Sequence, residues 1–271
     1  FNGDETFAMA STYKVAIATA VLDRVDRGEL SLDQLVEVPT DMYVTGVVAL
    51  AETFPHPGVQ LSVANLIEVM ITESDNTATD VNMGLAGGAA AVTENLRRLG
   101  ITDFRVDRTT REILMDFYNL PGVTPEAIAE AISNNPALVQ AQLDPNPDFE
   151  ADPRDHATPL AMLQLLLAID GGTAMSPESR EFLLGLMSRT RSGPGRIKGL
   201  MPMGTPVAHK TGTAGGIAND VGYVTLPDGR RFAIAVYTNS NETPTADRER
   251  AIAEISRMVF DHFYLAPVAK Q

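Results

Sequence analysis

The sequence predicts an α/β protein of the α+β type, in which helices cover an antiparallel sheet and a separate lobe is all helical. Apolar residues recur with helical spacing through most of the chain. Segments rich in β-branched residues, separated by short turns, lie near the end and precede a last helical pattern. We therefore expect one unit, residues 1–271, with a helical lobe over approximately 30–200 and a sheet lobe from approximately 1–10 and 201–271.

Each helix is expected from its apolar stripe and its end signals. Residues 11–27 are apolar on nearly every face, which is typical of a buried helix, and Gly28 ends the pattern. Ser62 is a good N-cap for a helix through about Glu73. The other expected helices begin at Thr77, cover 89–99 and 125–133, follow Thr158-Pro159 and Ser176-Pro177, and cover 247–264.

The strands are expected in three segments, "PVAHKTG", "NDVGYVTL" and "RRFAIAVYTN". Their alternation and β-branched content are typical of strands. The turn residues "PDG" between the last two segments favour an antiparallel hairpin.

Composition excludes several classes of function. A net charge of −14 without a basic cluster argues against binding nucleic acid. No run of about 18 apolar residues could span a bilayer. The chain has no cysteine, and its four histidines lack metal-ligand spacing, so we expect neither a metal nor another cofactor. No leader pattern is visible at the first residue, so this end does not reveal a location.

The segment "STYK" places Ser11 and Lys14 three residues apart. On a helix these positions share a face, so the amine can reach the hydroxyl. Burial lowers the pKa of a lysine and lets it accept the proton of the serine. The alternative is a helix cap followed by a surface lysine, because the pattern alone is short.

Two further segments favour the catalytic interpretation. "SDN" at 74–76 ends an apolar helix, and "KTG" at 210–212 lies on an expected strand. Together with "STYK" they form the set of motifs typical of class A β-lactamases and penicillin-binding proteins. The chain resembles a class A serine β-lactamase from "FNGDETFAMASTYK" through "MITESDNTATD" and "HKTGTAGGIANDVGYVTLPDG" to the final helix.

The resemblance implies a role for each matching residue. Ser11 would be the acylated nucleophile and Lys14 its general base. Ser74 would pass a proton to the leaving nitrogen, and Asn76 would hydrogen-bond Lys14 and the substrate side chain. Lys210 would supply positive potential for the proton relay and the substrate carboxylate.

The strand that carries Lys210 would also bind substrate. The resemblance implies that Thr211 and Thr213 donate hydroxyl hydrogens to the substrate carboxylate, with Gly212 between them. The backbone N–H groups of Ser11 and Thr213 would form the oxyanion hole.

Release of the acyl group requires a carboxylate that activates water. Class A enzymes take it from an ExxLN-like segment after "DR", and here "VDRTTREILMDF" offers Glu112 in an ExxMD match. The alternative is a solvated acid on a helix face. Asp116, at the final position of the match, would lie in the substrate site, where a second carboxylate raises one of the two pKa values.

The loop that follows is about thirty residues longer than in the family. Arg108 and Asp155 match the two loop ends that pair in relatives. The proline-rich insertion at about 117–154 either folds over the cleft or extends across the surface.

Three more positions have two interpretations each. Arg196 would bind the substrate carboxylate or be an exposed base, and Tyr43 would line the cleft or pack in the interior. His209 precedes Lys210 on the strand, so it should lie on the opposite face in a structural role.

The resemblance as a whole implies a β-lactamase/transpeptidase-like fold and hydrolysis of the β-lactam amide through a Ser11 acyl-enzyme. It implies a monomer that acts on a small-molecule β-lactam, a periplasmic or secreted location, and a helix with about one and a half strands ahead of the matching segment. The alternatives are a penicillin-binding or D-Ala-D-Ala peptidase-like enzyme or esterase with slow deacylation, and a non-catalytic β-lactam sensor.

Overall fold

A computed structural model describes residues 1–141, 144–239 and 241–266. Its main sheet has three antiparallel strands in the order β5-β6-β7, namely Val207–Ala214, Ile217–Thr225 and Arg231–Val236. Lys210 pairs with Val221 and Gly212 with Asn219 across β5 and β6, so β5 is an edge strand. The strands and the hairpin expected from the sequence are confirmed.

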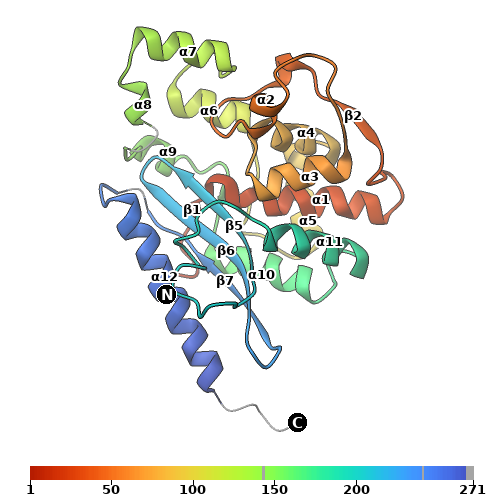
Figure 1. The fold of residues 1–271 in the computed structure, drawn as a ribbon, viewed down its shortest axis with the longest axis vertical. Coiled ribbons are helices and arrows are strands. Elements are labelled where there is room, and N and C mark those ends of the chain that lie inside the picture. Colours follow the sequence, from red (N-terminus) through yellow and green to blue (C-terminus); the bar gives the residue numbers. More distant parts are fainter. Residues whose placement is uncertain (142–143, 240, 267–271) are drawn as a thin grey trace.

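Helices cover both faces of this sheet (Figure 1). On one face β5, β6 and β7 pack against α12, Thr245–Leu265, through a cluster that includes Val224, Phe232 and Ile252. On the other face Tyr223 is buried against α10, Pro159–Asp170, and donates a hydrogen bond to Leu166 O at 2.7 Å. The sheet is therefore the middle layer between two helical layers.

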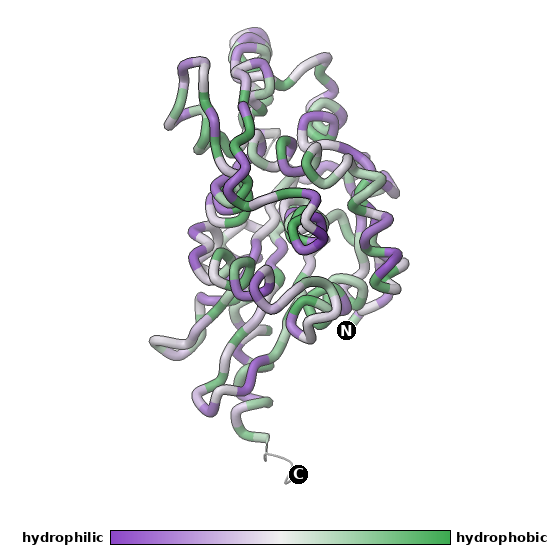
Figure 2. Tube along the Cα trace, turned by 90° about the vertical axis from the view of Figure 1, so that its right-hand side faces the viewer, coloured by the Kyte–Doolittle hydropathy of each residue, from purple (hydrophilic) through white to green (hydrophobic). Residues whose placement is uncertain are grey.

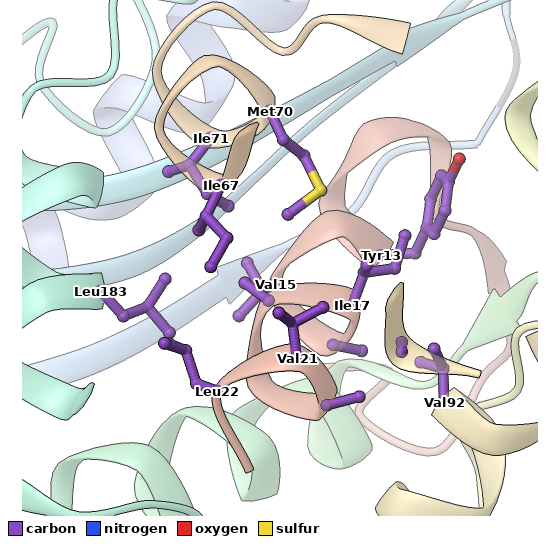
Figure 3. Packing of buried hydrophobic residues seen from close by; sticks show 14 of the residues in the cluster. Tyr13, Val15, Ile17, Val21, Leu22, Ile67, Met70, Ile71, Val92 and Leu183 are labelled. Carbon is purple, nitrogen blue, oxygen red and sulfur yellow. The ribbon is translucent and has the colours of Figure 1, made fainter. Parts of the chain in front are cut away.

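The helical part surrounds α1, Lys14–Asp26. Figure 3 shows Val15, Ile17 and Leu22 of α1 packed against residues of neighbouring helices, while the Tyr13 side chain extends away from them. The surrounding helices are α3 Val63–Thr72, α4 Asn76–Ala86, α5 Ala89–Arg98, α10 Pro159–Asp170 and α11 Pro177–Ser188. This all-round burial confirms the interpretation of an apolar, central helix.

Short elements complete the described chain. Two small antiparallel sheets are formed by β1 Phe7–Ala8 with β4 His156–Ala157, and by β2 Leu35–Glu37 with β3 Gln60–Ser62. The short helices are η1 Ala10–Tyr13, η2 Thr40–Met42 and α2 Ala49–Thr53. Pairing of β1 with β4 holds the segment before Ser11 beside the end of the long loop.

The long loop contains helices despite its proline-rich composition. They are α6 Thr110–Tyr118, α7 Pro125–Asn134, α8 Leu138–Ala141 and α9 Pro147–Ala151. Val44, Val123 and Ile128 form a small buried cluster that joins α7 to the helical part, with Leu114 and Tyr118 of α6 packed against it. The expected helix at 125–133 is confirmed as α7.

Capping signals account for most helix starts. Ser62, Thr158 and Ser176 each accept a hydrogen bond from the third residue of their helix, as expected from the sequence. Within the described residues no helix has both the length and the apolarity to cross a membrane. In Figure 2 hydrophobic segments alternate with hydrophilic ones along the chain.

Candidate active site

Ser11 lies in a 3-10 turn rather than at the cap of an α-helix. The turn is η1, and no side chain caps either η1 or α1. Ala10, just before Ser11, has a φ of 45°, which few residues other than glycine adopt. The interpretation of Ser11 as a helix cap is therefore wrong. The side chain lines a cavity of about 290 Å³ and is half-buried there.

Lys14, three residues after Ser11, is fully buried, with 0% exposure. Its amine donates to Ser74 O at 2.6 Å, to Asn76 Oδ1 at 3.0 Å and to Ser74 Oγ at 3.3 Å. Burial lowers the pKa of Lys14 to about 7, although Asp75 and Asp80 act in the opposite direction. The amine is therefore able to accept a proton near neutral pH.

Ser74 connects Lys14 to a second buried amine. Lys210, also 0% exposed, donates to Ser74 Oγ at 2.9 Å from β5. Burial and the charge of Lys14 hold the pKa of Lys210 well below its usual range. Ser74 has a φ of 64°, a strained left-handed conformation of the kind that is found at functional sites. One hydroxyl thus receives hydrogen bonds from two lysines and can relay a proton between them.

The rest of "SDN" fixes this arrangement. Asp75 is the N-cap of α4 and accepts from Ala78 N at 2.7 Å and from Leu50 N at 2.9 Å. Asn76 accepts a hydrogen bond from Lys14 Nζ through Oδ1 and donates one through Nδ2 to Thr45 O at 2.7 Å. Each of the three residues therefore has a defined geometric role.

The edge strand β5 lies directly against the turn that carries Ser11. A Cβ at Gly212 would lie 2.6 Å from Met9 O and 3.1 Å from Ser11 N, so only glycine fits there. The next residue, Thr213, is exposed and lines the same cavity as Ser11. Thr211 is buried, and its hydroxyl lies 2.5 Å from Ser192 Oγ. Ser11, Asn76 of "SDN" and Thr213, directly after "KTG", thus line one cavity.

A comparison with known proteins identifies the family at this point. A sequence model described as the beta-lactamase enzyme family matches residues 1–263. The chain belongs to this family. A curated β-lactamase of Bacteroides uniformis is 30% identical over 270 residues, 96% of this chain and 80% of that protein. Beta-lactamase VEB-1 of Pseudomonas aeruginosa is 29% identical over 97% of this chain and 80% of its own length.

Solved structures agree with this assignment. A β-lactamase from Chitinophaga pinensis has a TM-score of 0.79 at 31% identity, covering 97% of this chain and 88% of that one. The ancestral GNCA class A β-lactamase also has a TM-score of 0.79 at 31% identity, with the same two coverages. The chain is therefore a class A-like hydrolase with the β-lactamase fold, as the resemblance in the sequence implied.

Glu112 does not line the cavity beside Ser11, where the resemblance to class A enzymes predicts it. Its carboxylate completes a capping box at the start of α6, accepting from Thr109 N at 2.7 Å and from Thr109 Oγ1 at 2.9 Å. The side chain is exposed, while Thr110, Ile113 and Leu114 of the same helix line the cavity. The predicted position of Glu112 in the site is wrong, because the turn of α6 directs this residue to solvent.

Asp116 is also displaced from its predicted position. Its carboxylate pairs with Arg108 at 2.6 Å and with Arg154 at 3.0 Å on the outer side of α6. It does not line the cavity, so its predicted place in the substrate site is wrong. Arg108 pairs with Asp155 at 2.6 Å, which confirms the expected pairing of the two loop ends.

Arg196 is neither an exposed base nor a free carboxylate ligand. It is 3% exposed and donates to Gly212 O, Asn219 O and Thr213 Oγ1 at 2.7–2.9 Å, with Glu249 on Nε at 3.0 Å. All three nitrogens are engaged behind β5, so Arg196 positions the strand. Because it occupies an acceptor site of the Thr213 hydroxyl, that hydroxyl keeps its own hydrogen for a ligand.

Tyr43 and His209 have structural roles. Tyr43 is 5% exposed, donates to Phe54 O at 2.6 Å and lines a different pocket, so its prediction as a cleft residue is wrong. Its ring is held inward by this bond and by the core. His209 lies on the face of β5 opposite Lys210, with Nδ1 2.9 Å from both oxygens of Asp220, and its structural role is confirmed.

Four residues of this β-lactamase-family site escape notice in the sequence. Tyr13 and Thr110 line the cavity, and their hydroxyl oxygens lie 2.7 Å apart. Asp80 accepts from Thr110 N at 2.6 Å, which fixes the start of α6 on α4. Asn219 donates to Ala8 O at 2.9 Å and so holds the segment before Ser11 on β6. The one signal for them in the sequence is that some lie in or next to the known motifs.

Titratable ligands for a metal do not gather in this site. In the described ranges no three His, Cys, Asp or Glu side chains converge as metal ligands do. Asp155 carries the one carboxylate among the described residues that line the cavity, and it accepts from Arg108 Nε at 2.6 Å and from Asp107 N at 2.8 Å. The groups available for chemistry are therefore hydroxyls and amines.

Proposed function

We propose that this protein opens β-lactams by forming an acyl-enzyme on Ser11. Lys14 takes the hydroxyl proton as Ser11 Oγ attacks the amide carbon. The amide C–N bond then breaks, and Ser74 gives its proton to the leaving nitrogen while it regains one from the lysine amines. The N–H groups of Ser11 and Thr213 stabilise the oxyanion, because the first faces the edge strand that carries the second.

The observation that carries this proposal is the bridging hydroxyl of Ser74. It lies within 3.3 Å of Lys14 Nζ and within 2.9 Å of Lys210 Nζ, with both amines fully buried. Two buried lysines on one hydroxyl are costly for stability, since each loses hydration. Such an arrangement is explained by proton transfer.

The rate of acylation should depend on the protonation of Lys14. Its pKa is lowered to about 7, so below that pH the amine holds a proton and cannot accept the one from Ser11. We expect the second-order acylation rate to rise with pH through about 7 and then to level off. Stopped-flow or quenched mass measurements over pH 5 to 9, at roughly constant ionic strength, check this. A rate that keeps rising to the end of this pH range without levelling off, as the ordinary lysine pKa of 10.5 requires, would contradict it.

Release of the acyl group should be slow. The cavity offers no unengaged carboxylate among its described lining residues, and Asp155 is held by Arg108 and by backbone N–H groups. Water attacking the ester therefore lacks a carboxylate base. This observation favours the second candidate, a penicillin-binding or peptidase-like enzyme or an esterase, in which the acyl-enzyme is long-lived. A periplasmic or secreted location and a monomeric state stay predictions.

The experiment follows a chromogenic cephalosporin and the intact mass together. We expect a burst of colour of about one equivalent, an adduct on most chains and a slow later phase. Steady colour without an adduct would mean that another group activates water efficiently. The absence of both colour and adduct would overturn the proposal itself.

A matched variant tests the correction at Glu112 in the same experiment. Glu112→Gln keeps the capping box, because a glutamine at this position also accepts from the N-cap N–H. We expect the decay of the adduct to match that of the unsubstituted protein. A slower decay would return Glu112 to a catalytic role.

A further inference from the structure

The cavity beside Ser11 has an apolar wall. Ile113, Leu114, Phe117 and Tyr118 line it from α6, and Phe149 lines it from α9 in the insertion. A pocket with such a lining favours apolar and aromatic groups, because burying a charge there has no compensating partner. Asp155 is paired with Arg108, and the described lining residues include no lysine or arginine that could bind an anionic group.

The aromatic rings in this wall are packed against each other. Phe117 meets Phe149 edge to face, with ring centroids 5.2 Å apart and planes at 79°. It meets Tyr118 in the same way at 5.1 Å and 84°. These are favourable aromatic geometries, so the wall is a defined surface rather than a loose group of side chains.

The insertion contacts two elements beside the active site, helix α6 and the turn after β5. Asn146 accepts from Phe149 N at 3.0 Å, and its Nδ2 lies 3.4 Å from Phe117 O, which joins α9 to α6. A Cβ at Gly215 would lie 2.9 Å from Phe117 Cε2 and 3.2 Å from Asn146 Cβ. The turn after β5 therefore touches the insertion, and Figure 1 shows α9 beside that end of the sheet. This part of the insertion covers the cleft.

We propose that the insertion forms the acyl side-chain site of the enzyme, and that Phe149 and Phe117 select acyl donors with an aryl group over those with a small or anionic one. This inference rests on the proposed acylation of Ser11. Phe149 is the specificity-determining residue, because it belongs to the insertion and reaches the cavity that Ser11 lines.

The test compares three β-lactams that share the penicillin nucleus and differ in the acyl group, phenylacetyl, acetyl or malonyl. Intact mass gives the rate of adduct formation for each. We expect the phenylacetyl compound to react at least about ten times faster than the acetyl one, and the malonyl compound to be slowest. In Phe149→Ala the phenylacetyl advantage should fall about ten-fold, with the acetyl rate within about two-fold of the starting protein.

Two variants guard against a loss of folding. Phe149→Leu keeps an apolar side chain and should retain part of the preference, while Phe263→Ala on α12 removes an exposed phenylalanine elsewhere and should retain all of it. Melting curves identify any variant that is unfolded. An unchanged preference in folded Phe149→Ala and Phe149→Leu, or no preference in the starting protein, would overturn the inference.

A measurement without acylation separates this inference from the proposed function. Calorimetry with phenylacetylglycine and acetylglycine, which are not β-lactams, reports on the wall alone. Tighter binding of the phenylacetyl compound, weakened in Phe149→Ala, supports the site even if no β-lactam labels Ser11. Equal binding together with labelling that ignores the acyl group would leave the proposed function standing and overturn the inference.

Discussion

Replacing Ser11 with alanine is expected to abolish covalent labelling by β-lactams. Ser11 lines the cavity, and its backbone nitrogen lies beside Gly212 of β5. Without the nucleophile the covalent route is lost, and the rate of acylation should fall by about 10⁶-fold, as for removal of a nucleophile in other serine enzymes. Intact mass after incubation with a chromogenic cephalosporin measures the adduct, and absorbance measures turnover.

The stability of this variant should be nearly unchanged. In the described structure the Ser11 hydroxyl caps no helix, so its removal leaves no cap unsatisfied. Ser188→Ala is the matched control, because Ser188 is an exposed serine on α11 whose hydroxyl bonds Gly185 O. That variant should label normally. An adduct that persisted on Ser11→Ala would show that another hydroxyl is the nucleophile, and peptide mapping would identify it.

Residues in contiguous motifs could be predicted from the sequence, because a motif fixes local geometry. Lys14 follows Ser11 within one turn. "SDN" contains Ser74, which both lysines contact, and "KTG" contains the second lysine, Lys210. The structure brings Lys14 and Lys210 to Ser74. Likewise the hairpin and the capped helices depend on turn and cap residues that act locally.

Residues whose role depends on the direction of a helix were not predictable. Glu112 matches a spacing, but the register of α6 is set by the capping box at Thr109 and by Asp80 on α4. Thr110, two residues before Glu112, lines the cavity, and two residues along a helix turn a side chain by about 200°, since each residue advances about 100°. The segment "EILMD" therefore matches the family motif in residue type, but its glutamate lies on the face of α6 that points away from the cavity.

Burial decided the remaining errors. Arg196 lies among the carbonyls of β5 and β6, and Tyr43 packs toward Phe54, because long-range contacts supply their partners. The insertion was recognised by its length, but its placement over the cleft depends on contacts between Asn146, Phe117 and Gly215. No local pattern encodes contacts of this kind, since they join segments about thirty to one hundred residues apart.

Gly212→Ala is expected to reduce acylation by about 100-fold, because a displacement of about 1 Å at a reacting group has this effect. The added methyl would lie 2.6 Å from Met9 O, 3.1 Å from Ala10 Cβ and 3.1 Å from Ser11 N. Two of these atoms are backbone, so the clash cannot be relieved by a rotamer change. Strand β5 and the turn η1 must separate, which moves the Ser11 N–H relative to Thr213 and disturbs the oxyanion hole.

Stability should fall less than activity in this variant. Overpacking typically costs about 1–3 kcal/mol, and the β5–β6 pairing on the other side of Gly212 is unaffected. Acylation rates by mass and melting curves by circular dichroism give the two quantities. Gly84→Ala is the matched control, since a Cβ there meets nothing within 4 Å in α4 and should stabilise the helix by up to about 1 kcal/mol. Acylation of Gly212→Ala at the rate of the control would show that β5 need not touch the Ser11 backbone during the reaction.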